Sequence, residues 1–167
     1  MVQKTPESDE VEIPLRDSLQ PETFDINRPG VSMGKKRVLV VEDNCDTREL
    51  MALVIAEAGY EVVEASTGFE AIDQARTARP ALIIMDIGLP GMSGVEAIAR
   101  LKEDPSTLHI PVIVNTAYPN GSPFVERAIA AGAAEIGYKP NNFPAIRETV
   151  KGYLFSEEPA SFKEILR

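Results

Sequence analysis

Side chains that can do chemistry follow four apolar, strand-like runs of this sequence: Glu42 and Asp43, then Asp86, Thr116 and Lys139. One acid at the end of a strand is common in turns and caps. Three carboxylates, a hydroxyl and an ammonium at corresponding ends of four runs indicate a functional cleft instead. Carboxylates within a few ångströms of one another repel, so they stay ionised together only beside a cation. Oxygen ligands without a soft donor favour Mg²⁺ or Mn²⁺, so the pattern predicts a divalent cation site.

The expected ligands come from two strand ends and the loop after the second one. We expect Asp43 and Asp86 to bind the cation directly and Glu42 to bind it directly or through a water molecule. The backbone carbonyl of Gly88 can fill a further position. Such a cation attracts a phosphate-bearing molecule and offsets the negative charge that gathers when a carboxylate attacks phosphorus.

Asp86 is the best candidate for that attack because the apolar run that it ends, Ala81 to Met85, is expected to be a central strand, which brings the Asp86 side chain to the floor of the crevice. A carboxylate nucleophile yields an aspartyl phosphate, an established form of covalent catalysis. Thr116 can then donate its hydroxyl, and Lys139 its ammonium, to the phosphoryl oxygens. These residues are also compatible with two other functions: a phosphohydrolase that forms an aspartyl phosphate on small substrates, and an interaction scaffold that uses no phosphate.

The elements that must position these residues alternate five times between strand-like and helix-like patterns. The expected strands are Arg37–Val41, Tyr60–Glu64, Ala81–Met85, Ile110–Asn115 and Ala134–Tyr138. Helices are expected from Asp46 to Ala58, from Thr67 to near Pro80, from Ser93 to Glu103, from Ser122 to near Ala131, and after Asn142. This alternation predicts an α/β fold, a doubly wound five-stranded parallel sheet with helices on both faces. The carboxyl ends of its strands meet at one crevice.

Local signals mark where several helices begin and end. Ser93 with Glu96, and Thr67 with Glu70, have the spacing of capping boxes. Gly59 follows the first helix at the position that favours glycine.

Apolar periodicity predicts the buried side of two helices. The first helix is expected to bury a stripe of Leu50, Leu53, Val54 and Ala58. The last helix, capped by Asn142, is expected to bury Ile146, Val150 and Leu154.

Composition excludes several classes of function. The 167 residues are 44% hydrophobic and 26% charged, enough for one domain with a proper core. A net charge of −9 argues against direct binding to nucleic acid or to an anionic membrane surface. Cys45 is the single cysteine, which fits a reducing compartment. Residues 1–30 contain no apolar segment of the secretory kind, so we expect a cytoplasmic protein.

The chain divides into three parts. Residues 1–34 form an acidic extension with four prolines and no persistent period, for which we expect disorder or loose docking. Residues 35–155 hold the alternating pattern. Residues 156–167 form a tail with room for one short helix and none for an output domain.

Four motifs together resemble the receiver domain of response regulators in two-component signal transduction. They are VLVVEDN at 38–44, LIIMDIGLPGMSG at 82–94, VIVNTA at 112–117 and YKP at 138–140. The resemblance covers nearly all of residues 36–155 and implies a flavodoxin-like strand order, 2-1-3-4-5. It also implies that Asp86 accepts phosphate from a phosphohistidine, and that the Lys139–Pro140 peptide bond is cis.

The resemblance further implies a signalling protein rather than an enzyme. Its partners would be a sensor histidine kinase or a histidine phosphotransfer protein, together with an unknown downstream protein that reads the phosphorylated state. Dimerisation through the last helices is left open. One departure is Ile136, which stands three positions before Lys139, where the family usually has an aromatic switch residue. Another is Gly88, two positions after Asp86, where many relatives carry a side chain that affects dephosphorylation. Phosphohydrolases that form an aspartyl phosphate generally carry a second Asp at this position, and this chain does not.

Overall fold

The computed structural model of the chain describes residues 35–140 and 143–155. The strands in these ranges are β1 (Arg37–Val41), β2 (Glu61–Ala65), β3 (Leu82–Met85), β4 (Val112–Thr116) and β5 (Glu135–Tyr138). The helices are α1 (Cys45–Glu57), α2 (Gly68–Ala78), α3 (Gly94–Glu103), α4 (Pro123–Ala130) and α5 (Phe143–Phe155). The predicted alternation is therefore confirmed, and the ends of the elements differ from the prediction by at most two residues.

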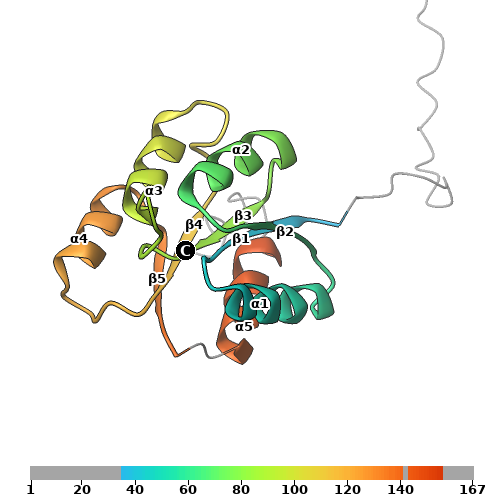
Figure 1. Cartoon of the computed structure of the whole chain (residues 1–167). Coiled ribbons are helices and arrows are strands. Elements are labelled where there is room, and N and C mark those ends of the chain that lie inside the picture. The colour runs from blue at the N-terminus through green and yellow to red at the C-terminus, as the bar shows by residue number, and fades with distance from the viewer. Residues whose placement is uncertain (1–34, 141–142, 156–167) are drawn as a thin grey trace, which may run out of the picture. The chain divides into compact units, whose positions relative to one another are not determined.

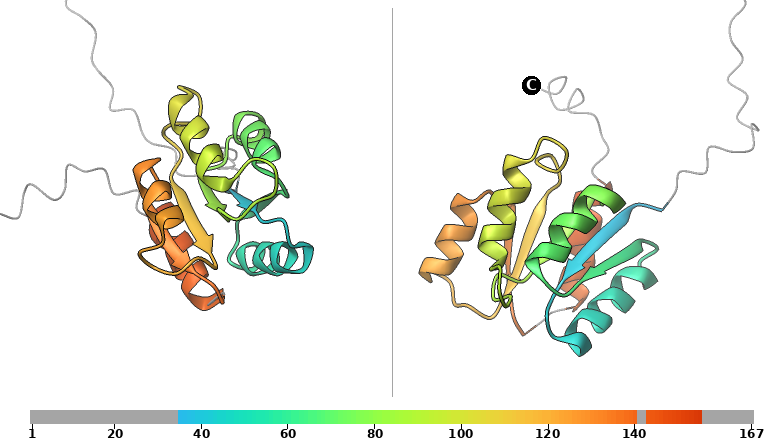
Figure 2. Two further views of the ribbon diagram at one scale, coloured as in Figure 1. Left: turned by 60° about the vertical axis from the view of Figure 1, so that its left-hand side comes forward. Right: turned by 45° about the horizontal axis from the view of Figure 1, so that its top comes forward.

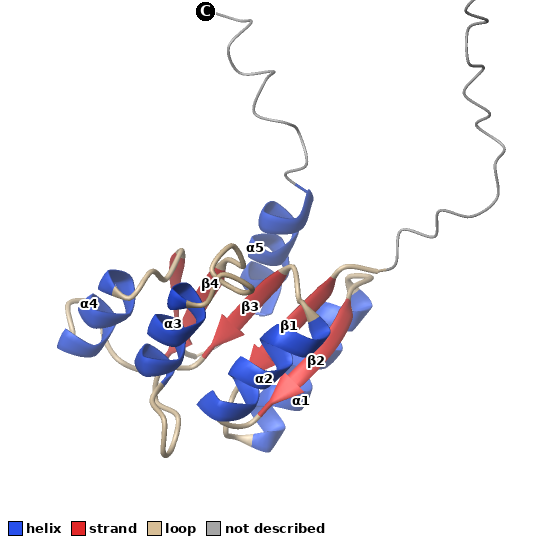
Figure 3. Cartoon of the chain, turned by 90° about the horizontal axis from the view of Figure 1, so that it is seen from above, coloured by secondary structure: helices blue, strands red, loops and turns tan. Residues whose placement is uncertain are grey.

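The strands form one parallel sheet in the order β2-β1-β3-β4-β5. Figure 3 shows that neighbouring strands run in the same direction, as the pairing register requires. The expected flavodoxin-like order is confirmed. Val41 of β1 is paired with Met85 of β3, so the residues that follow these two strands emerge side by side.

Helices cover both faces of the sheet (Figures 1 and 2). The buried residues of α2, α3 and α4 share one core cluster with Leu39, Ile83 and Val114. The buried residues of α1 and α5 share a second cluster with Val38 and Ile84. Alternate residues of β1 and β3 therefore enter opposite cores, and all four residues of β3 are buried. This explains why the β3 sequence is apolar without a break.

The predicted buried stripe of α1 is wrong at Leu50 and Leu53, while its other two residues, Val54 and Ala58, are partly buried. The helix buries Met51 and Ile55, whereas Leu50 is 44% exposed and Leu53 is 56% exposed. Residues 50–56 are all apolar, so periodicity within this segment hardly distinguishes one face from another. Packing against the sheet and α5 selects the face. In α5 the prediction is confirmed, because Val150 and Leu154 are buried and Ile146 packs partly buried against the same cluster.

The helix caps follow the sequence signals with one exception. Ser93 and Glu96 form the complete capping box of α3. Thr67 caps α2 by accepting from the Glu70 N–H, but the close donors to the Glu70 carboxylate are the N–H and the hydroxyl of Ser66, at 2.7 and 2.9 Å. Gly59 ends α1 with a φ of 97°, as predicted.

The expectations for residues 1–34 and 156–167, and for Asn142 as a helix cap, lie outside the described residues. Among the residues that the structure describes, every helix is too short or too polar to cross a membrane.

Candidate functional site

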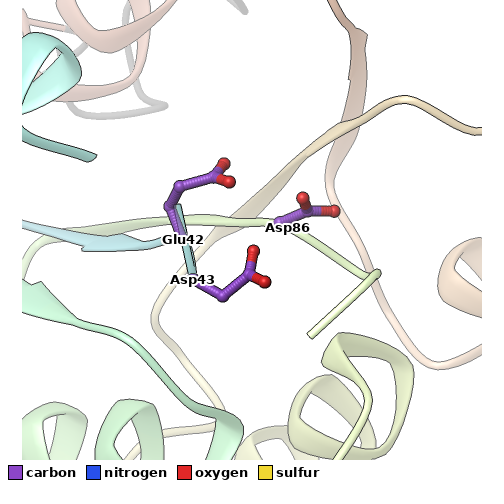
Figure 4. Close-up of side chains that lie close together, drawn as sticks. All are labelled: Glu42, Asp43 and Asp86. Atoms are coloured by element: carbon purple, nitrogen blue, oxygen red, sulfur yellow. The ribbon is translucent and has the colours of Figure 1, made fainter. Parts of the chain in front are cut away.

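Three carboxylates gather at the carboxyl ends of β1 and β3 (Figure 4). Glu42 and Asp43 directly follow β1, and Asp86 directly follows β3. The Asp86 N–H donates to the carbonyl of Val41 at 2.9 Å, which continues the pairing of the two strands into the site. Each residue offers one carboxylate oxygen such that all three lie within 4.8 Å of one another. Glu42 is 2% exposed and Asp86 is 8% exposed, while Asp43 faces solvent.

Lys139 supplies a positive charge between two of these acids. It follows β5, and its backbone N–H donates to the carbonyl of Thr116 at 2.8 Å. Its Nζ lies 2.6 Å from Asp86 Oδ2 and 2.7 Å from Glu42 Oε2. The Lys139–Pro140 bond is cis, as expected. One ammonium therefore joins β5 to both β1 and β3 across the sheet edge.

Burial and this ion pair shift two pKa values. Burial raises the pKa of the Glu42 carboxyl above its ordinary value, although the hydrogen bond and charge of Lys139 act in the opposite direction. Burial alone would lower the pKa of the Lys139 ammonium, but its hydrogen bonds to Asp86 and Glu42 outweigh burial and raise it. Lys139 therefore stays charged at neutral pH.

The loop after β3 holds the Asp86 side chain and backbone. The Gly88 N–H donates to Asp86 Oδ1 at 2.9 Å. At the start of α3, the backbone of Gly94 lies against Asp86 and Ile87 so closely that a Cβ there would collide with the Asp86 carbonyl oxygen. Glycine at position 94 therefore allows α3 to begin directly beside Asp86.

Thr116, the last residue of β4, is fully buried. In this conformation its hydroxyl oxygen accepts a hydrogen bond from the Tyr118 N–H at 3.2 Å. The Tyr118 ring stacks on Phe124 of α4 with centroids 4.6 Å apart. It also passes within 3.8 Å of the position that a Cβ on Gly88 would occupy. An aromatic ring thus borders the flank of Asp86 that Gly88 leaves open.

Ile136 packs partly buried against the core under α2, α3 and α4. The aromatic residue of β5 is instead Tyr138, which is exposed and donates its hydroxyl to Asn120 Oδ1 at 3.1 Å. The aromatic ring on the Thr116 side of the site therefore comes from Tyr118, in the loop after β4.

Sequence reasoning missed Arg48 as a neighbour of the site. Its Nη1 donates to the backbone carbonyl of Glu42 at 2.8 Å. A lone arginine in the first turn of a helix has no motif around it, so only its contacts reveal this position.

The chemistry of the donor set is compatible with a divalent cation. Glu42, Asp43 and Asp86 offer hard oxygen atoms only, which suits Mg²⁺ or Mn²⁺. Three carboxylates with one ammonium leave a local excess of negative charge, which such an ion would neutralise. The structure brings together the predicted carboxylates and Lys139, and it places Thr116 at the end of the neighbouring strand β4.

Comparison with known proteins points to one family. A family model described as the response regulator receiver domain matches residues 38–151. The chain is 42% identical to the polar-differentiation response regulator DivK of Brucella anthropi over 119 residues, which are 71% of this chain and 96% of that protein. Among solved structures, chemotaxis protein CheY4 of Vibrio cholerae is 28% identical with a TM-score of 0.67, over 72% of this chain and 99% of the other. A putative response regulator from Chloroflexus aurantiacus is 31% identical with a TM-score of 0.67, over 73% and 99%.

Proposed function

This chain belongs to the response regulator receiver domains of two-component signal transduction, and from that premise we propose that Asp86 is its phosphoacceptor. The family is a signalling family whose members interact with histidine kinases or phosphotransfer proteins. The phosphoryl donor is then a phosphohistidine on such a protein. We assign the receiver domain to residues 35–155 and propose that it acts in the cytoplasm.

One observation carries the proposal: the Lys139 ammonium bonds both Glu42 and Asp86, at 2.7 and 2.6 Å. The ammonium offsets the negative charge of both carboxylates. A cation therefore already stands where a phosphoryl group would bring further negative charge.

Glu42, Asp43 and Asp86 would hold Mg²⁺ or Mn²⁺, and the Gly88 carbonyl can add a backbone oxygen. A bound divalent cation would draw in the phosphoryl donor and neutralise the charge that develops on the phosphoryl oxygens. The chain's own groups provide the rest of the chemistry.

In the transfer step, an Oδ atom of Asp86 forms a bond to phosphorus while the phosphorus–nitrogen bond of the donor breaks. The imidazole leaves with its electron pair and takes up a proton. The Lys139 ammonium then donates a hydrogen bond to one phosphoryl oxygen. The Thr116 hydroxyl, whose oxygen accepts from the Tyr118 N–H in this structure, turns to donate to a second phosphoryl oxygen. The Tyr118 ring connects that rearrangement to Phe124 of α4, so we place the output on the surface of α4, β5 and α5.

The test is phosphorylation by acetyl phosphate with Mg²⁺, followed by intact-mass measurement. We expect one added phosphoryl group on the wild type and on Asp73→Asn, a control at an exposed aspartate of α2. Asp86→Asn should stay unmodified. Equal modification of Asp86→Asn would reject the proposed acceptor.

The phosphohydrolase and scaffold alternatives differ from this proposal in measurable ways. A phosphohydrolase would use a second acid two positions after Asp86, where this chain has Gly88. Multiple turnovers of a small phosphate ester would therefore favour the hydrolase. A wild type that binds no Mg²⁺ at millimolar concentration would favour the scaffold. Phosphotransfer profiling against purified histidine kinases would identify the partner.

A further inference from the structure

Arg48 connects the carboxyl ends of two neighbouring strands. It lies in the first turn of α1, and its side chain is only 17% exposed. Its Nη1 donates to the Glu42 carbonyl at 2.8 Å, and its Nε donates to Glu64 Oε2 of β2 at 3.1 Å. The planar guanidinium can serve both acceptors at once because its N–H groups diverge in a fixed geometry.

The Glu42 carbonyl belongs to the peptide group that joins Glu42 to Asp43. Rotation of that peptide group would turn the two carboxylates, one on each side of it, relative to each other. On the amino side, the Glu42 N–H is already held by the carbonyl of Ala65 at 3.1 Å. On the carboxyl side, Asn44 caps α1 through the Thr47 N–H at 2.8 Å. Between these two anchors, Arg48 holds the Glu42 carbonyl.

We propose that Arg48 is a positioning residue for the divalent cation site, because it holds the peptide group between Glu42 and Asp43. This inference rests on the proposed function in that it needs the cation site. It assigns Arg48 no contact with the cation or with phosphate. Groups that orient ligands from outside the coordination sphere typically change metal affinity by about 10- to 100-fold when they are removed.

Charge and position make opposite predictions for the loss of Arg48. A positive side chain beside a cation site opposes cation binding, so its removal would tighten binding if charge alone mattered. Loss of the hydrogen bond to the Glu42 carbonyl frees the peptide group and weakens binding. The direction of the change therefore separates the two effects.

Arg37 provides a matched control at the other end of the same strand. It also donates to a carbonyl, that of Ala78 at 3.0 Å, and pairs with a β2 glutamate, Glu61, at 3.0 Å. It lies at the first residue of β1, whereas the site lies after the last. Arg37→Ala thus removes the same kinds of bond from the sheet without touching the site.

The experiment is titration of the full chain with Mn²⁺, with free Mn²⁺ read by electron paramagnetic resonance, because the chain has no tryptophan to report binding. For Arg48→Ala we expect the Kd to rise about tenfold. For Arg37→Ala it should stay at the wild-type value. Arg48→Lys keeps one donor for the Glu42 carbonyl without the bond to Glu64, so its Kd should lie between those of wild type and Arg48→Ala.

An unchanged or lower Kd in Arg48→Ala would overturn the inference while leaving the proposed function intact, since the wild type would still bind Mn²⁺. The same holds if Arg37→Ala weakens binding equally, because the effect would then be general destabilisation. If Arg48→Ala does not fold, Arg48→Lys decides: a Kd no higher than that of the wild type, or an equal rise of the Kd in Arg37→Ala, rejects positioning. Absence of binding by the wild type would reject the proposed function and the inference together.

Discussion

Replacing Lys139 with methionine would remove the ammonium that two buried carboxylates share, while keeping an unbranched side chain of similar length. Two charge-assisted hydrogen bonds are lost, at 2.6 and 2.7 Å, and Glu42 and Asp86 are left close together with no counter-ion. Breaking one side of a buried ion pair typically costs about 3–5 kcal/mol. We expect about 3 kcal/mol, the lower end, because Lys139 is itself partly exposed and water can reach the site beside Asp43.

The pH dependence of this loss has a defined sign. Folding raises the pKa of the Glu42 carboxyl above its value in the unfolded chain. Protonation of Glu42 therefore favours the folded state, fully at pH values below the unfolded-state pKa, and this contribution is lost as the pH rises through the folded-state pKa. Without Lys139, the hydrogen bond and charge that hold this pKa down are gone, and it rises further. The protonated carboxyl needs no counter-ion. The deficit of Lys139→Met should therefore be largest near pH 8 and shrink towards pH 5.

The assay is urea unfolding followed by circular dichroism at pH 8 and pH 5, in the presence of EDTA. Lys151→Met is the matched control, because Lys151 makes an exposed ion pair with Glu148 at 3.1 Å. Such a pair contributes about 0.5 kcal/mol or less. A deficit for Lys139→Met no larger than that of the control, or one that grows as pH falls, would refute the reasoning about the shared ammonium.

Two further predictions concern the scaffold around the site. Gly94→Ala should lower the free energy of unfolding by about 3 kcal/mol, because the added Cβ would overlap the backbone of Asp86. Chemical denaturation measures this loss. A variant as stable as the wild type would contradict the close contact between the start of α3 and the Asp86 backbone. Ile55→Ala should cost about 3 kcal/mol, whereas Leu53→Ala should cost less than about 1 kcal/mol, because α1 buries the first side chain and exposes the second. Equal losses in thermal unfolding would show that α1 packs through a different face.

Much of the fold follows from local signals. The unbroken apolar run before Asp86 required a strand with both faces covered, and the structure buries all of β3. Ser93 and Glu96 specify the start of α3 because their capping interactions span only three residues. The face of α1 could not be read in the same way, because residues 50–56 are apolar on every side and only packing against the sheet selects Met51 and Ile55.

The sequence by itself determined which chemical groups stand at the strand ends, because a side chain's identity and its place after an apolar run are local properties. Only the tertiary structure decided how these groups meet: Lys139 pairs with residues 97 and 53 positions away, and Arg48 joins β1 to β2 through its contacts with Glu42 and Glu64. Such contacts depend on strand order and register, which are set when both faces of the sheet are packed at once. No short segment of the chain contains that information.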